Sequence, residues 1–174
     1  MRRALAILCL VLAGPASAQA FGEADAARHR TALGLFERAC LYAAPGFAET
    51  QQVFAQAGMA RPENSSSYRE PGLGIYGAVV PVQAGQVFGQ QCTVMLERGH
   101  LAVMVIGLRT AISRFAISGS VNESAPSRHT DPVLWDFRMP RIGAVSVTAG
   151  LAREGIGVIA MQVADRVGDG EASQ

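Results

Sequence analysis

The spacing of apolar and polar positions predicts two consecutive helices at the start of the folded part of the chain. Residues 24–44 contain no proline and are rich in alanine. Apolar side chains recur there at intervals of three and four, as one buried helical face requires: Leu33, Phe36, Cys40 and Ala44. Pro45 and Gly46 end this pattern. A second helical pattern covers residues 47–57, and Gly58 stands where a left-handed cap is expected.

The rest of the chain alternates between extended and helical patterns. Runs rich in β-branched and aromatic residues predict five strands, over residues 73–82, 87–97, 133–139, 144–149 and 155–163. Residues 100–116 are predicted as a third helix, because their apolar positions step by four and three. This order predicts an α+β fold, with an antiparallel sheet of about five strands and with two N-terminal helices and one central helix packed on one face.

Two stretches show neither period. Residues 61–74 and 119–131 are rich in proline, serine and glycine and predict polar loops. The first of them is the loop that we expect to carry function.

The N-terminus has the three parts of a secretory signal peptide. Arg2 and Arg3 precede an apolar run over residues 4–13, and small residues follow up to Ala18. An apolar run of this length is too short to span a bilayer core, which needs about 20 residues. We expect cleavage after Ala18, with Ala20 as a second register. The expected organisation is a signal peptide (1–18), a single domain (19–166) and a flexible tail (167–174).

Secretion changes the charge and the expected location. All 15 basic residues are arginine, and loss of Arg2 and Arg3 leaves 13 of them against 14 acidic residues. A chain so nearly neutral has no excess of cations for binding phosphates, so we expect no nucleic acid partner. Composition favours a bacterial source, and we expect a periplasmic protein with no stable membrane insertion after cleavage.

Two cysteines remain after cleavage. In an oxidising compartment Cys40 and Cys92 are expected to form a disulfide, although two buried free thiols are the alternative. A loop of roughly fifty residues closed in this way stabilises a fold by about 4 kcal/mol in the chain-entropy model. The bond would join the first helix to the second predicted strand.

The same cysteines carry a family resemblance. Phe36 and Cys40 on a helix, followed by Cys92 and Val94 on a strand, resemble motifs of small secreted (periplasmic) bacterial proteins to which no activity is assigned. The motifs touch only the half of the chain up to this strand, so the resemblance implies a compartment and no function.

The run from Gly72 to Gly77 matches the GxGxxG pattern of dinucleotide sites, where a strand precedes the glycines and a helix follows. Here Pro71 precedes the run and a predicted strand begins inside it. We therefore expect a glycine-rich strand entry and predict no nucleotide or other cofactor.

Ser127, His129 and Asp131 place a nucleophile, a base and an acid close together in sequence. A working triad needs its base within about 3 Å of both partners, whereas same-face neighbours on a strand lie about 7 Å apart. This spacing argues against a complete triad on one strand. A small periplasmic hydrolase that uses His129 as acid or base, with Ser127 or Asp131, is kept as an alternative function. The other interpretation is a polar loop in which Asp131 caps a turn.

The histidines do not suggest a metal site. His29, His100 and His129 are scattered, without the paired spacing that metal ligands show. Glu97 and His100 are three residues apart and form a second candidate acid–base pair for the hydrolase.

Alternation from Trp135 to Arg138 separates an aromatic face from a charged one. The pattern favours an inward, core position for Trp135; an outward one would make Trp135, with Tyr68 and Tyr76, a recognition patch. In the absence of a catalytic or metal pattern, we expect a non-enzymatic binding or accessory module of the cell envelope whose partner is another envelope or secreted protein. Besides the hydrolase, the second alternative is a carrier of an apolar ligand. The composition, with 49% hydrophobic residues, permits this function.

Overall fold

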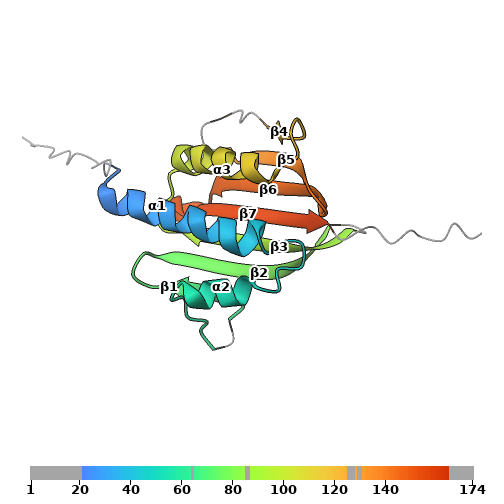
Figure 1. Cartoon of the computed structure of the whole chain (residues 1–174). Helices are drawn as coiled ribbons and strands as arrows, with labels where there is room; N and C mark the ends of the chain where they lie inside the picture. Colours follow the sequence, from blue (N-terminus) through green and yellow to red (C-terminus); the bar gives the residue numbers. More distant parts are fainter. Residues whose placement is uncertain (1–20, 64, 85–86, 125–127, 129–130, 165–174) are drawn as a thin grey trace, which may run out of the picture.

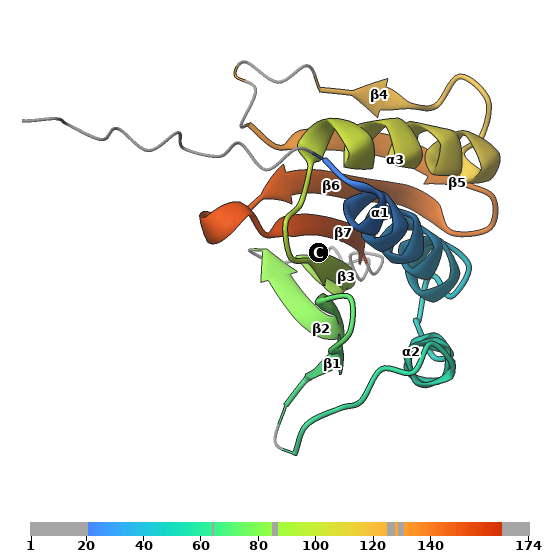
Figure 2. The same cartoon turned by 90° about the vertical axis from the view of Figure 1, so that its left-hand side faces the viewer.

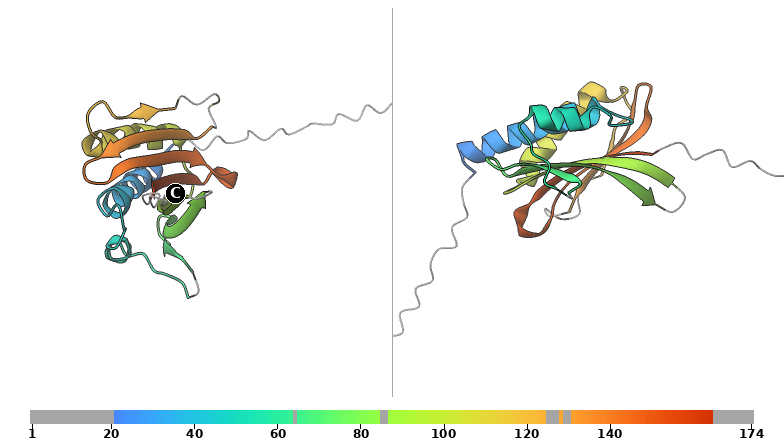
Figure 3. Two further views of the ribbon diagram at one scale, coloured as in Figure 1. Left: turned by 90° about the vertical axis from the view of Figure 1, so that its right-hand side faces the viewer. Right: turned by 90° about the horizontal axis from the view of Figure 1, so that it is seen from below.

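The computed structural model describes residues 21–63, 65–84, 87–124, 128 and 131–164. The predicted signal peptide and the predicted tail lie outside these residues. The chain forms an α+β fold in which three α-helices cover one face of a seven-stranded antiparallel sheet (Figures 1 and 3).

The helices lie where the apolar periods predict them. They are α1 (Glu23–Phe36), α2 (Thr50–Gln56) and α3 (Leu101–Phe115). A π-helical turn, Glu37–Leu41, continues α1 and buries three consecutive residues, Ala39, Cys40 and Leu41. A regular α-helix turns each residue by about 100°, so three consecutive side chains span about 200° around its axis. The π-helical turn has more residues per turn, which narrows this span. Gly58 adopts the expected positive φ, 76°, after α2.

The strands run in the spatial order β1-β2-β3-β7-β6-β5-β4, and every neighbouring pair is antiparallel. Five of them confirm the predicted strands: β2 (Ile75–Ala84), β3 (Val87–Leu96), β5 (Val133–Met139), β6 (Gly143–Leu151) and β7 (Gly157–Ala164). A short 3₁₀ turn, Arg153–Gly155, joins the last two.

The two remaining strands correct the prediction of about five. They are β1 (Ser67–Glu70) and β4 (Asn122–Glu123), and both lie inside stretches predicted to be loops. Each is short, polar and at an edge of the sheet, so it buries no apolar row that alternation would reveal. Their partners are β2 and β5 respectively.

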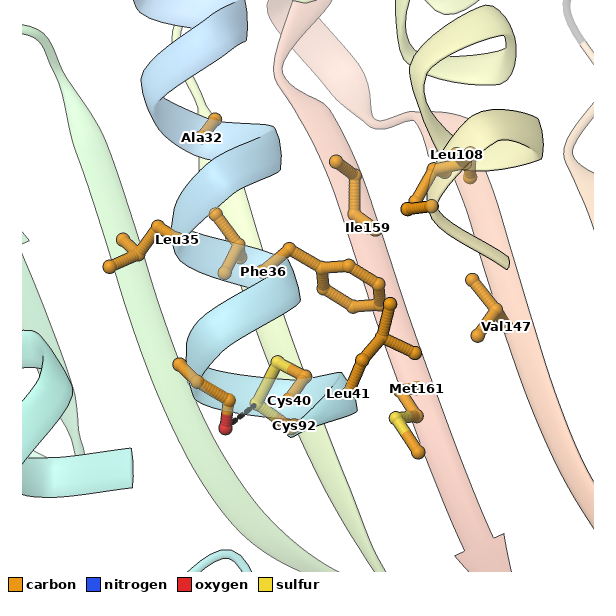
Figure 4. Close-up of a cluster of buried hydrophobic side chains, with 14 of the residues drawn as sticks. Ala32, Leu35, Phe36, Cys40, Leu41, Cys92, Leu108, Val147, Ile159 and Met161 are labelled. Atoms are coloured by element: carbon orange, nitrogen blue, oxygen red, sulfur yellow. Dashed lines mark hydrogen bonds between the residues drawn. A yellow bond between two sulfur atoms is a disulfide. The ribbon is translucent and has the colours of Figure 1, made fainter. Parts of the chain in front are cut away.

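The core lies between the helices and the sheet. Figure 4 shows Phe36 of α1 and Leu41 of the π-helical turn beside Ile159 and Met161 of β7, while Leu35 points to the other side of the helix. All five side chains are buried. The predicted disulfide is present: Cys40 and Cys92 have an S–S distance of 2.04 Å and a Cα–Cα distance of 5.5 Å, and both are fully buried. It joins the π-helical turn after α1 to the middle of β3.

Strand β5 alternates strictly between buried and exposed residues. Trp135 lies on its inner side with 1% of its surface exposed, and its indole N–H donates to Glu123 at 2.8 Å. The inward interpretation of this residue is therefore confirmed. A recognition patch that includes Trp135 is wrong, because the side chain is part of the core.

Candidate functional site

Of the residues of the predicted hydrolase site, the structure describes Asp131, Glu97 and His100. Ser127 and His129 lie outside the described residues. Asp131 is half-buried, and its carboxylate accepts the backbone N–H of Arg128 at 2.8 Å. The backbone N–H of Asp131 donates in turn to the Arg128 carbonyl at 3.0 Å. These bonds form the capped turn that was the alternative interpretation of Asp131.

Glu97 and His100 have different partners. The Glu97 carboxylate accepts the hydroxyl of Tyr76 at 2.7 Å, and this bond raises the pKa of the tyrosine hydroxyl. The His100 ring packs edge-on against Phe21, with 4.7 Å between centroids, and lies 5.7 Å from the ring of His29. The hydrogen bond of Glu97 and the ring contacts of His100 involve different residues, and none of these contacts joins the two side chains.

His29 is buried, with 1% of its surface exposed. Its Nδ1 lies 2.7 Å from the Asp25 carbonyl, and its Nε2 accepts the backbone N–H of His100 at 2.9 Å. Burial, first, and the positive charges of neighbouring groups lower the pKa of this imidazole. Both ring nitrogens are used in bonds to the backbone, which indicates a structural role rather than an acid–base role.

A salt bridge completes this cluster. Arg28 donates to the Asp25 carboxylate at 2.6 Å and to the Leu73 carbonyl at 2.6 Å. The Asp25 carboxylate also accepts the backbone N–H of Gly22, and this bond, followed by that from Arg28, lowers its pKa. The cluster thus ties the start of α1 to the turn between β1 and β2 and to the start of α3.

One of the predicted binding residues does line a cavity. Tyr68 belongs to a pocket of about 120 Å³ between α2 and the first two strands, here called the α2–β1 pocket. Figure 2 shows α2 and β1 at the same end of the sheet. The lining residues come from four segments: Thr50, Gln51, Phe54, Arg61, Ser66, Tyr68 and Val79.

Gly77 explains how the floor of this pocket forms. A Cβ atom at Gly77 would lie 2.4 Å from the ring of Phe54, so the missing side chain lets the ring lie against β2. Tyr68 stands opposite Gly77 in the β1–β2 register, and its ring centroid is 5.2 Å from that of Phe54. The last glycine of the GxGxxG run therefore makes room for an aromatic ring, and the run leads into β2 rather than into a helix.

Helix α2 and the following loop are also held by specific bonds. The Thr50 hydroxyl is buried and donates to the Ala39 carbonyl of the π-helical turn at 2.6 Å. After α2, Ala60 and Arg69 exchange backbone bonds of 2.9 and 2.8 Å, which closes the loop against β1. The Arg61 side chain donates from Nε to the Ser65 carbonyl at 2.7 Å. These bonds hold the start of α2 and the loop that follows it, which are two of the segments that line the pocket.

The lining has one charge. Arg61 is the cation, and none of the described carboxylates forms an ion pair with it. The other polar groups are neutral: the Gln51 amide and the hydroxyls of Thr50, Ser66 and Tyr68. The seven lining residues include no carboxylate, imidazole or thiol. The pocket can therefore hold a polar group but offers no side chain for general acid–base catalysis near neutral pH.

The opposite face of the sheet is uncovered by helices (Figure 3). It carries a shallow apolar depression of about 210 Å³ over β6 and β7. Its lining consists of small and apolar residues: Pro132, Thr148, Gly150, Leu151, Ala152, Val158 and Ala160.

Tyr76 lies on this uncovered face, because it precedes Gly77 on β2 and successive side chains alternate. The guanidinium of Arg69 lies 5.5 Å from the centre of its ring. Tyr68, across from Gly77, faces the helices instead. The three predicted binding residues therefore occupy three places: a pocket for Tyr68, the open face for Tyr76 and the core for Trp135.

The chain matches no family model, no curated protein and no solved structure. Within the described residues, three or more histidine, cysteine, aspartate or glutamate side chains nowhere gather in a way that would hold a metal ion. None of the described helices is both long and apolar enough to cross a membrane.

The sequence predicts the wall of the α2–β1 pocket that β1 and the preceding loop form, and it does not predict the wall that α2 and β2 form. Tyr68 and the loop that contains Arg61 and Ser66 were candidates by composition. Thr50, Gln51 and Val79 gave no local signal, because their meeting depends on how α2 packs on β2. Gly77, inside a strand, was the one local sign of a close approach.

Proposed function

We propose that this chain is a non-enzymatic binding module that works outside the cytosol, in the bacterial envelope, and recognises a partner protein through the α2–β1 pocket. The observation that carries the proposal is the lining of the pocket. An aromatic and apolar floor, neutral hydrogen-bonding groups and a single arginine suit recognition of a small group on a partner. The lining provides no nucleophile–base pair.

Two observations support the location. The buried disulfide between Cys40 and Cys92 is compatible with an oxidising compartment. The predicted signal peptide over residues 1–18 provides the route. The periplasm is the compartment that we favour on composition.

A position-specific crosslinking experiment tests the proposal. A photoreactive amino acid replaces Gln51, which is exposed and lines the pocket, or Gln162, which is exposed on the other face of the sheet. In cells that secrete the protein, we expect a discrete adduct with an envelope protein from position 51 and none from position 162. An adduct from position 162 alone, or none from either, would refute recognition through the pocket.

Carriage of a small apolar ligand is the second candidate function. The depression over β6 and β7 is the observation that favours it, since polar atoms contribute little to its surface. Replacing the half-buried Ala160 with arginine should abolish binding of a fluorescent apolar probe if this face holds a ligand. The hydrolase remains a prediction from sequence, because Ser127 and His129 lie outside the described residues.

A further inference from the structure

We propose that the group bound by the α2–β1 pocket is a carboxylate carried on a short apolar stem. This inference rests on the proposed function and adds the chemical class of the ligand. It follows from the charge of the lining, the orientation of Arg61 and the size of the cavity.

Charge selects an anion. Arg61 is the only ionised side chain among the seven lining residues, and none of the described carboxylates neutralises it. An uncompensated arginine beside neutral hydroxyl and amide groups attracts a negative group and gives a positive one no partner. With one cation available, a singly charged anion is matched better than a phosphate, which carries close to two charges.

The orientation of Arg61 selects a planar anion. Its Nε already donates to the Ser65 carbonyl at 2.7 Å, which restrains the direction of the guanidinium plane. The two terminal nitrogens remain as parallel donors, an arrangement that matches the two oxygens of a carboxylate. Ser66, Tyr68 and Gln51 also line the pocket and carry hydroxyl and amide groups that can donate.

The size of the pocket suits a small group. The pocket has a volume of about 120 Å³, somewhat less than the roughly 150 Å³ of an engineered apolar cavity that holds a benzene molecule. This space is sufficient for a carboxylate with two or three carbon atoms behind it. Phe54 and Val79 provide the apolar surface for those carbons.

Two sources supply such a group. It is the carboxylate of a free short-chain acid, or it is the C-terminus of a peptide segment presented by the partner protein. Both place the same atoms in the pocket, so the experiment has one arm for each source.

Nuclear magnetic resonance titration of the uniformly ¹⁵N-labelled secreted protein tests the inference. The probes are propionate and its neutral counterpart propionamide, which has nearly the same shape. We expect saturable shifts of the Gln51, Ser66 and Tyr68 amides with propionate and at least tenfold weaker binding of propionamide. The second arm compares the tripeptide Gly-Ala-Ala with a free and an amidated C-terminus. A free-acid peptide that binds more tightly than both propionate and the amidated peptide identifies a peptide terminus as the source. A peptide that binds no more tightly than propionate identifies the free acid, which keeps the carboxylate assignment and contradicts recognition of a partner protein.

Variants assign the effect to the pocket. Arg61→Gln should weaken propionate binding at least tenfold, while Arg30→Gln, at an exposed arginine of α1 outside the pocket, should leave it unchanged. Tyr68→Phe keeps the ring and removes the hydroxyl, and it should weaken binding severalfold. Because Arg61 is exposed, its replacement should preserve the spectrum of the folded protein, which serves as the folding control.

The outcomes separate the two proposals. Propionamide binding as tightly as propionate, or Arg61→Gln binding like the unaltered protein, would overturn the carboxylate assignment. If neither carboxylate probe shifts the pocket amides while the Gln51 crosslink persists, the pocket recognises another group and only the present inference fails. Absence of both the shifts and the crosslink removes both proposals.

Discussion

The Nε2 atom of His29 accepts a hydrogen bond from the backbone N–H of His100 at 2.9 Å, across 71 residues of sequence. The Nδ1 atom of the same ring lies 2.7 Å from the Asp25 carbonyl and donates its proton there. Only a neutral imidazole protonated at Nδ1 satisfies both bonds. The start of α3 is therefore fastened to α1 through a ring that must stay uncharged.

Stability should fall as the pH falls below about 6.5, the ordinary pKa of histidine. Burial lowers the pKa of His29 in the folded protein, so in this range the unfolded chain takes up the proton first and unfolding is favoured. The loss should continue until the pH passes below the folded pKa. The charged or titratable groups that face the ring are Asp25, Arg28 and His100; the lowered pKa of Asp25 adds a loss only below about 4.

Urea unfolding at pH 7.5, 6.5 and 5.5 checks this expectation. His29→Gln should cost about 1–3 kcal/mol at pH 7.5, because it disturbs two buried bonds, and should flatten the dependence on pH. His100→Gln is the control, since the N–H that it contributes belongs to the backbone. A free energy of unfolding that does not change between pH 7.5 and 5.5 in the unaltered protein contradicts the assignment.

Removal of the disulfide should cost about 4 kcal/mol for a closed loop of this length. The cysteines are 52 residues apart in sequence and both fully buried. The double substitution Cys40→Ala with Cys92→Ala, followed by urea unfolding, measures the cost. Reduction of the unaltered protein should lower stability by a similar amount, and a double variant as stable as the oxidised protein would show that the bond contributes nothing.

Gly77→Ala should destabilise the fold by about 1–3 kcal/mol through overpacking against Phe54. The added Cβ would lie 2.4 Å from the ring. Gly46→Ala is a matched control, because nothing lies within 4 Å of the position that its Cβ would take. In a double-mutant cycle with Phe54→Leu the two changes should be strongly non-additive. Additive costs would mean that the glycine does not position the ring.

Trp135→Ala should cost about 3–5 kcal/mol, the usual range for emptying a large aromatic site in a core. Its neighbour Leu134 points to the other side of β5 and is 36% exposed, so Leu134→Ala should change stability by about 0.5 kcal/mol or less. Thermal unfolding of the two variants measures the difference. Similar costs would contradict the inward orientation of Trp135.

The main elements could be predicted because each carries its own period. Strand β5 alternates strictly and was predicted residue for residue, and α3 shows its apolar stripe in spite of its β-branched residues. The cysteines could be paired because only two remain after the predicted cleavage. Strands β1 and β4 are polar edge segments whose extended form depends on pairing with the neighbouring strand. No hydrophobic alternation within either segment predicts that form.

The candidate site was harder to predict because it depends on register. Tyr68 and Tyr76 are eight residues apart and both aromatic, yet the β1–β2 turn places them on opposite faces of the sheet. The bond between His29 and His100 joins positions without any shared local pattern. Such contacts follow from the packing of whole elements, which single-sequence periodicity does not describe.

The disulfide has one further consequence for the α2–β1 pocket. Its seven lining residues, from Thr50 to Val79, all lie between Cys40 and Cys92. Oxidation therefore closes a covalent ring of chain that contains the entire pocket. Reduction opens that ring and leaves α2 held by the hydrogen bond from Thr50 to Ala39 and by the packing of Phe54 at Gly77. The integrity of the pocket is thereby linked to the redox state of the compartment in which the protein resides.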